Sequence, residues 1–155
     1  MRPVVVLVAW LATGAALAAE PAERTLCQPG EALVFSCTVG AKLASLCRSG
    51  NDRLSYRFGK PGAVELAYPN AGAIGAFERS NALLYGGGIV TVSFKLGEFE
   101  YGIYSKMGRA AGGGDPETED GIAVARNGKR VATLVCDDGG AGFRESIESL
   151  PKKPG

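Results

Sequence analysis

The sequence predicts an all-β protein, an antiparallel meander of eight or nine short strands that forms a barrel or a sandwich, with a short C-terminal helix and disulfides. Three observations predict this class. Apolar and polar residues alternate with a period of two, turn residues separate the alternating segments, and the small chain contains four cysteines. Helical periodicity is visible only in GFRESIESL, through Phe143, Ile147 and Leu150.

The N-terminus has the features of a secretory signal peptide. Arg2 supplies a positive charge, an apolar run follows, and Ala16-Leu17-Ala18 forms an A-x-A cleavage signal. The apolar run is shorter than the roughly 20 residues that span a bilayer. We therefore expect a soluble mature protein, periplasmic or secreted. The expected segments are a signal peptide at 1–19, a single β domain at 20–150 and a flexible tail at 151–155.

The expected mature chain carries almost no net charge. The whole chain has 17 cationic and 16 anionic residues, and the signal peptide contributes one cation, Arg2, so 17 − 1 = 16 cations remain against 16 anions. Binding to nucleic acid or to a membrane surface depends on an excess of positive charge. We therefore expect no nucleic-acid partner, and no membrane insertion after signal cleavage.

The first hairpin is expected in LVFSCTVGAKLASLC, residues 33–47. A loop at 40–42 places the apolar residues of both arms on one face and leaves the other face more polar. In this register Cys37 lies opposite Ser45 and only diagonal to Cys47.

The second hairpin is expected in SYRFGKPGAVELAYP, whose interleaved rings and cations also suit a binding patch. All the large apolar residues fall on one face if Phe58 lies opposite Val64 across a five-residue loop. The opposite face then pairs Arg57 with Glu65. This pairing favours core strands, with Lys60 exposed at the turn.

The two later hairpins contain the clearest turn signals. Gly97-Glu98 suits a two-residue type II′ turn, and Asn127-Gly128 is the strongest short hairpin signal in the chain. The expected cross-strand pairs are Leu96 with Phe99, Lys95 with Glu100, Phe94 with Tyr101, Val92 with Ile103, Val124 with Val131, and Ile122 with Thr133.

The four cysteines indicate two disulfides, for which three connectivities are possible. Cys27 precedes the first expected strand by too few residues to fold back onto Cys37. The diagonal position of Cys47 would strain a bridge to Cys37. We therefore predict the bridges Cys27–Cys47 and Cys37–Cys136. A redox dithiol or a zinc site is disfavoured because the chain has no C-x-x-C motif and no histidine.

The absence of histidine removes Ser-His-Asp and Cys-His machinery and the commonest metal ligand. The acidic cluster DPETEDG, residues 115–121, has the acid spacing of a calcium loop. Its glycine comes one place late, however, and its twelfth position is Arg126. We interpret the cluster as a solvated connection, and we predict no catalytic residue, cofactor or metal site.

Several stretches resemble a family of small, largely uncharacterised secreted proteins of Gram-negative bacteria. They are LCQPGEALVFSC, GAKLASLC, LSYRFGKPGAVELAYP and NGKRVATLVC. The resemblance covers most of residues 26–136 and is most specific in YRFGKPG and in the cysteine positions. It implies export to the periplasm and implies no particular reaction. The architecture is loosely similar to that of periplasmic lysozyme inhibitors, which are small disulfide-containing β proteins.

These features favour a secreted, non-enzymatic protein-binding module, such as an inhibitor of an envelope hydrolase. A rigid scaffold would present a loop to a concave active site. The candidate loop is SKMGR, with Ser105, Lys106 and Arg109, because Lys106 or Arg109 could pair with the two carboxylates of a glycosidase. Lys60 is a further candidate contact.

The alternative is a structural or small-ligand-binding periplasmic β-barrel protein. Its interior or cleft would hold a small apolar ligand among the rings of Tyr56, Phe58, Phe94 and Tyr101. Such rings also serve simply as core residues. An enzyme that works through paired carboxylates is the third hypothesis.

Overall fold

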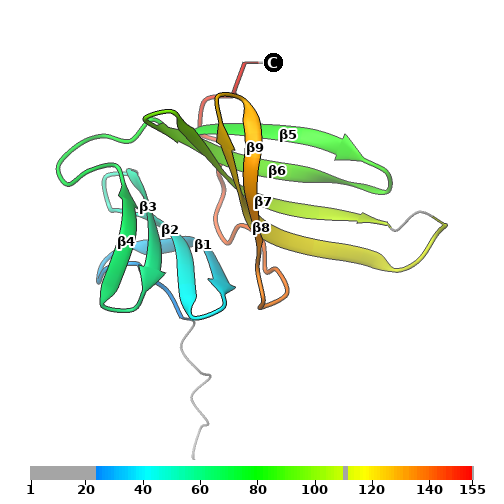
Figure 1. Ribbon diagram of the computed structural model, residues 1–155, viewed down its shortest axis with the longest axis horizontal. Helices are drawn as coiled ribbons and strands as arrows, with labels where there is room; N and C mark the ends of the chain where they lie inside the picture. The colour runs from blue at the N-terminus through cyan, green and yellow to red at the C-terminus, as the bar shows by residue number, and fades with distance from the viewer. Residues whose placement is uncertain (1–23, 110–111, 155) are drawn as a thin grey trace, which may run out of the picture.

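The computed structural model describes residues 24–109 and 112–154, so the predicted signal peptide at 1–19 lies outside the described residues. In the described part of the chain, nine strands form two antiparallel sheets in sequence order (Figure 1). Sheet A contains β1 (Ala32–Val39), β2 (Lys42–Arg48), β3 (Leu54–Lys60) and β4 (Ala63–Tyr68). Sheet B contains β5 (Glu78–Leu84), β6 (Gly87–Leu96), β7 (Phe99–Arg109), β8 (Pro116–Arg126) and β9 (Lys129–Val135).

The all-β antiparallel prediction is confirmed, but the barrel is wrong because neither sheet closes. The connection at 69–77 begins with a proline, contains two glycines, and separates the sheets. The free edge of β1 bonds to the segment after β9 and not to another strand: the Asp137 amide donates to the Thr38 carbonyl at 2.7 Å. The described part of the chain contains no helix that is long and apolar enough to cross a membrane.

The predicted C-terminal helix is also wrong, because residues 142–150 form bends and turns. Its apolar residues nevertheless reach the core: Ile147 is buried, and the Phe143 ring centroid lies 5.3 Å from that of Phe35. The Arg144 amide donates to the Val34 carbonyl of β1 at 2.8 Å. A segment this short is a marginal helix by itself, so bonding to β1 prevails over helix formation.

Phe94 lies at the centre of the core that the two sheets share. Its ring is stacked on Tyr68 at 4.3 Å and on Tyr101 at 5.1 Å between centroids. The rings of Tyr56 and Phe77 lie at 5.2 and 5.5 Å. Because Tyr56 and Tyr68 belong to sheet A while Phe94 and Tyr101 belong to sheet B, this ring cluster joins the sheets.

Of the four predicted hairpin registers, the structure confirms that of β6–β7. All the predicted β6–β7 pairs are present. The β8–β9 turn at Asn127-Gly128 is also present, but a bulge at Val124/Ala125 shifts the register, so Ile122 faces Leu134 and not Thr133. A bulge displaces one strand by one residue relative to its partner.

The registers predicted for sheet A are wrong. The β1–β2 turn contains two residues, so Cys37 faces Ala44 instead of Ser45. In β3–β4 a bulge at Gly59 makes Phe58 face Leu66 instead of Val64. This bulge requires glycine, because a Cβ atom there would lie 2.6 Å from the Ala63 carbonyl oxygen.

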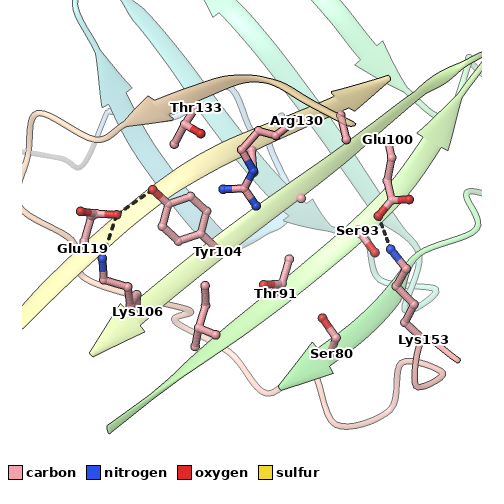
Figure 2. A pocket seen from close by; sticks show the side chains of 14 residues that line it. Ser80, Thr91, Ser93, Glu100, Tyr104, Lys106, Glu119, Arg130, Thr133 and Lys153 are labelled. Carbon is pink, nitrogen blue, oxygen red and sulfur yellow. Dashed lines mark hydrogen bonds and ion pairs between the residues drawn. The ribbon is translucent and has the colours of Figure 1, made fainter. Parts of the chain in front are cut away.

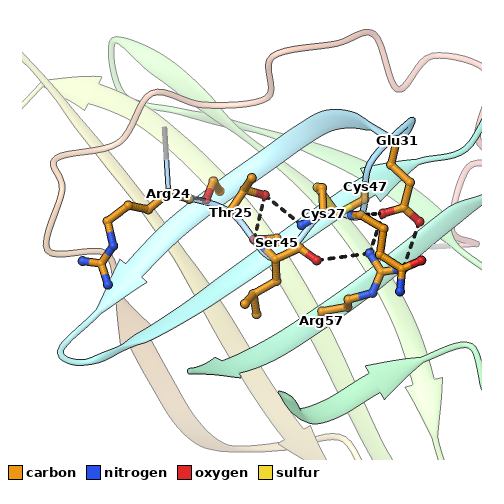
Figure 3. Close-up of a disulfide and its surroundings, with 10 residues drawn as sticks. Arg24, Thr25, Cys27, Glu31, Ser45, Cys47 and Arg57 are labelled. Carbon is orange, nitrogen blue, oxygen red and sulfur yellow. Dashed lines mark hydrogen bonds and ion pairs between the residues drawn. A yellow bond between two sulfur atoms is a disulfide. The ribbon is translucent and has the colours of Figure 1, made fainter. Parts of the chain in front are cut away.

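The two disulfides join the predicted pairs, Cys27–Cys47 and Cys37–Cys136. Figure 3 shows the first of them beside Glu31 and Arg57, whose side chains are bonded at 2.6 and 2.9 Å. The Glu31–Arg57 ion pair attaches the segment before β1 to strand β3. The predicted pairing of Arg57 with Glu65 is therefore wrong.

The C-terminal residues also return to the sheets. The Lys153 amide donates to the Arg79 carbonyl at 2.8 Å, and Lys152 forms a parallel bridge with Arg79. The Lys153 ammonium pairs with Glu100 of β7. The part of the expected tail that the structure describes thus lies alongside the edge of β5.

We expect loss of the Cys37–Cys136 bridge to destabilise the fold more than loss of Cys27–Cys47. The Cys37–Cys136 bridge spans 99 residues, and the Cys27–Cys47 bridge spans 20. Closing the longer loop removes more entropy from the unfolded chain, and the loop-length relation gives a difference of about 1.4 kcal/mol. Urea unfolding of the two double alanine variants measures this difference. Equal stabilities, or the reverse order, would contradict the expectation.

We expect Glu31→Gln to lower stability at neutral pH and to flatten its acid dependence. The hydrogen bond from Arg57 lowers the pKa of Glu31 below 4.5. The pair therefore stabilises the fold above about pH 4.5, and this contribution is lost as the pH falls through the lower folded-state pKa. The expected loss at pH 7 is about 1 to 3 kcal/mol.

Urea unfolding at pH 7 and pH 3 measures both effects. The matched control is Glu65→Gln, which removes the more exposed ion pair with Lys42 and should change stability little. A Glu31→Gln variant with the same pH profile as the unmodified protein would show that the Glu31–Arg57 pair does not produce the acid dependence.

Candidate functional site

The structure separates the predicted partner-binding residues. Ser105, Lys106 and Arg109 lie on β7 of sheet B, whereas Lys60 ends β3 of sheet A. The segment 105–109 is thus the end of a strand and not a loop. Lys60 is exposed at the β3–β4 turn, as predicted, but belongs to a different sheet from the other three residues.

The three residues on β7 have different surroundings. Lys106 lies 3.4 Å from Glu119 of β8, measured from ammonium nitrogen to carboxylate oxygen. Ser105 faces Asp120 across the β7–β8 pair. Arg109 ends the strand, and its amide donates to the Tyr85 carbonyl at 3.2 Å. Among these side chains, only Arg109 lies at the outermost end of the sheet.

Sheet B extends beyond the region that sheet A covers, as the β5–β6 and β7–β8 hairpins at the right of Figure 1 show. This free end carries large exposed apolar side chains. Leu83 is 94% exposed, Tyr85 77% and Met107 54%. We call Leu83, Leu84, Tyr85 and Met107 the apolar tip.

The register explains why Leu83 and Met107 share one face of the tip, whereas Leu84 points to the opposite face. Leu83 faces Gly88, and Gly88 faces Met107, so these three residues form one row across β5, β6 and β7. Alternation along β6 places this row on the same face as Val92 and Phe94, which are buried in the core. The core-facing surface of sheet B therefore continues into solvent at the tip.

Glycines hold the backbone of the tip closely packed. A Cβ atom at Gly87 would lie 2.0 Å from the Met107 carbonyl oxygen, and one at Gly86 would lie 3.0 Å from Cγ of Arg109. Gly86 also has a positive φ of 68° at the β5–β6 turn. The glycines therefore permit the tight turn and the close strand packing of this hairpin. Sequence reasoning missed the tip, although Leu83-Leu84-Tyr85 directly before a glycine turn is a signal for it.

A second candidate site is an apolar cleft of about 360 Å³ between the sheets. Tyr56, Phe58 and Leu66 line it from sheet A. Phe99, Tyr101, Ile122, Val124, Ala132 and Leu134 line it from sheet B, and Glu65 is its one charged lining residue in the described chain.

Three of the four rings predicted to surround an apolar ligand line this cleft. They are Tyr56, Phe58 and Tyr101, and Phe94 lies behind them in contact with Tyr56 and Tyr101. Burial raises the pKa of the Tyr56 hydroxyl, which therefore stays protonated in any physiological medium.

One group of described residues has the spacing of metal ligands: Cys27, Glu31 and Cys47. Its two sulfur atoms are bonded to each other, and the Glu31 carboxylate is engaged by Arg57. Disulfide sulfur is not the thiolate that metals bind. These contacts therefore have a structural role, because they attach the segment before β1 to β2 and β3.

No protein-family model, curated protein or solved structure matches the chain. The resemblance to secreted proteins of Gram-negative bacteria therefore stays an expectation, and the function must be argued from the tip and the cleft.

Proposed function

We propose that the protein is a non-enzymatic protein-binding module of the bacterial periplasm, which inserts the apolar tip into a pocket of a partner. The exposure of Leu83 together with Tyr85 and Met107 carries the proposal. Monomeric proteins rarely leave contiguous large apolar side chains uncovered, and such groups mark interaction sites. Tyrosine is also enriched among the residues that contribute most to the binding energy of interfaces.

The backbone contacts of the tip support the same function. The Tyr85 carbonyl accepts a hydrogen bond from the Arg109 amide of β7, and Gly87 of β6 packs directly against the β7 backbone. A binding surface that is already ordered loses less entropy when a partner binds. An inhibitor that must enter a concave site benefits from this property.

Arg109 favours an envelope hydrolase, such as a lysozyme, as the partner. Its side chain forms no ion pair within the described residues, whereas Lys106 is paired with Glu119. A glycosidase active site contains two carboxylates, to which a guanidinium can donate in bidentate fashion. Of the two predicted cations, Arg109 is therefore the one we assign to the partner's carboxylates.

The periplasmic location rests on the predicted signal peptide and on the disulfides. Both cysteine pairs are oxidised in the structure, and disulfides persist in oxidising compartments such as the periplasm.

The inter-sheet cleft supports a second candidate function, the binding of a small apolar ligand. Its volume lies within the roughly 300 to 1,000 Å³ of small-molecule sites. Its lining is aromatic and aliphatic except for Glu65 at 46% side-chain exposure. The ligand would be uncharged and of the size of two or three aromatic rings.

We expect the oxidised protein to bind at least one enzyme in a panel of purified envelope glycan hydrolases, including lysozymes, and to inhibit it. The double variant Leu83→Ser/Tyr85→Ser should weaken binding at least tenfold, because it removes the apolar contacts of the tip. Surface plasmon resonance measures the affinity, and a glycan-cleavage assay measures the inhibition.

The matched control is Ile74→Ser, which removes an apolar side chain of similar exposure, 73%, from the β4–β5 connection. Circular dichroism verifies that each variant is folded. The hydrolase proposal is wrong if no enzyme in the panel binds, and the assignment to the tip is wrong if the double variant binds as tightly as the control.

For the cleft, we expect the uncharged probe N-phenyl-1-naphthylamine to bind with enhanced fluorescence. Ala132→Trp should weaken this binding at least tenfold by filling the cleft. Thr133→Trp is the matched control, because the next residue along β9 points to the opposite face. Equal binding by both variants, with loss in the tip variant, would place the probe at the tip and contradict a cleft site.

A further inference from the structure

The face of sheet B that points away from sheet A is hollowed by a groove of about 380 Å³ (Figure 2). Val92, Ile103 and Ile122 are buried in the core, so their neighbours along each strand point to this outer face. The groove is distinct from the tip and the cleft. It lies within the volume range of small-molecule sites.

The strand register places small residues opposite one another at the base of this outer groove, which we call its floor. Ser93 faces Gly102, Gly102 faces Ala123, and Ala123 faces Thr133, so one row across four strands consists of small residues. Thr91 adds another hydroxyl beside this floor. The floor thus offers hydroxyl groups and little apolar bulk to a ligand.

Tyr104 forms one wall but offers no ring face for stacking. It is buried against Gly121, where a Cβ atom would lie 2.6 Å from the tyrosine oxygen. Its hydroxyl donates to Glu119 at 2.9 Å. Burial, and then this bond, raises the pKa of Tyr104 to about 12, so the hydroxyl remains a donor at physiological pH. The wall therefore disfavours ligands that bind by stacking.

The acidic residues of the groove each have a cationic partner. Glu119 is paired with Lys106, and Glu100 is paired with Lys153. Arg130 extends between these two pairs in Figure 2 and forms no hydrogen bond or ion pair with a described residue. The lining residues therefore carry a net charge of 3 − 2 = +1, which is located at Arg130.

We propose that the outer groove binds a hydroxylated monocarboxylate of the size of a uronic acid sugar. The ligand's carboxylate accepts hydrogen bonds from the Arg130 guanidinium, and its hydroxyl groups bond to Ser93, Thr91 and Thr133. A guanidinium holds a carboxylate through two parallel bonds, which fixes the orientation of the ligand. The proposal does not depend on the protein-binding function of the tip.

The test is an NMR titration of the oxidised, uniformly ¹⁵N-labelled protein with sodium D-glucuronate at constant ionic strength. We expect saturable shifts of the Gly102, Ala123 and Thr133 amides. D-glucose lacks the charge and acetate lacks the hydroxyl groups, so each should bind at least tenfold more weakly. Glucose 6-phosphate tests whether a phosphate replaces the carboxylate.

Arg130→Gln should weaken glucuronate binding at least tenfold. The matched control is Arg126→Gln on the same hairpin, because Arg126 pairs with Glu98 and does not line the groove. Ala123→Leu tests the groove without removing a charge, and it should also weaken binding at least tenfold by filling the floor.

Binding of D-glucose or acetate as tight as that of glucuronate would overturn the proposal, and so would three further results. They are the absence of saturable shifts, equal weakening by Arg130→Gln and Arg126→Gln, and unchanged binding in Ala123→Leu. Saturation by glucose 6-phosphate without saturation by glucuronate would replace the carboxylate with a phosphate and reject the proposed ligand class.

Discussion

The packing of Phe94 against rings from both sheets is the contact on which the rest of the structure depends. Its stack with Tyr68 and Tyr101 places sheet A over only one part of sheet B. Two surfaces follow from this partial cover. The far end of sheet B stays bare and forms the apolar tip, and the margin where the sheets diverge beside Tyr56 forms the cleft. The aromatic cluster determines where the two sheets cross, and it therefore determines the positions of both candidate sites.

The segment after β9 completes this arrangement by covering an edge that would otherwise be open. The Cys37–Cys136 bridge begins it, and Asp138 and Asp137 then accept bonds from the amides of Thr38 and Gly40. Unpaired strand edges invite pairing with other chains, so covering β1 protects the fold from aggregation. Farther along, buried Asp120 accepts a bond from the Gly142 amide at 2.7 Å and directs the segment across the core.

The features that could be predicted from the sequence are those that local residues determine. The β6–β7 register follows from a two-residue turn and from alternation, and both lie within one short segment. The β1–β2 register also involves Gly40, whose amide bonds to Asp137 far along the chain, and no local pattern shows that bond. Bulges at Gly59 and Val124 shift pairings without changing which residues are apolar. For the site, SKMGR lies at the same end of sheet B as the apolar tip. The exposed leucines and Tyr85 were not predicted, because an apolar run normally indicates a buried strand.

The outer groove and the core depend on the same register, because they occupy opposite faces of the same strands. On β7, Tyr101 and Ile103 face the core while Gly102 and Tyr104 face the groove. A shift of one residue would exchange these sets, placing Gly102 in the core and the large apolar side chains in the groove. The register that packs the core therefore also determines the geometry of the groove. Core packing does not itself require small residues at the base of the groove or an Arg130 without an ion-pair partner among the described residues, because these side chains lie on the outer face of the sheet. The small residues at the base of the groove and the Arg130 guanidinium without such a partner are thus features of the outer face that core packing leaves unexplained, and the proposed ligand would contact both.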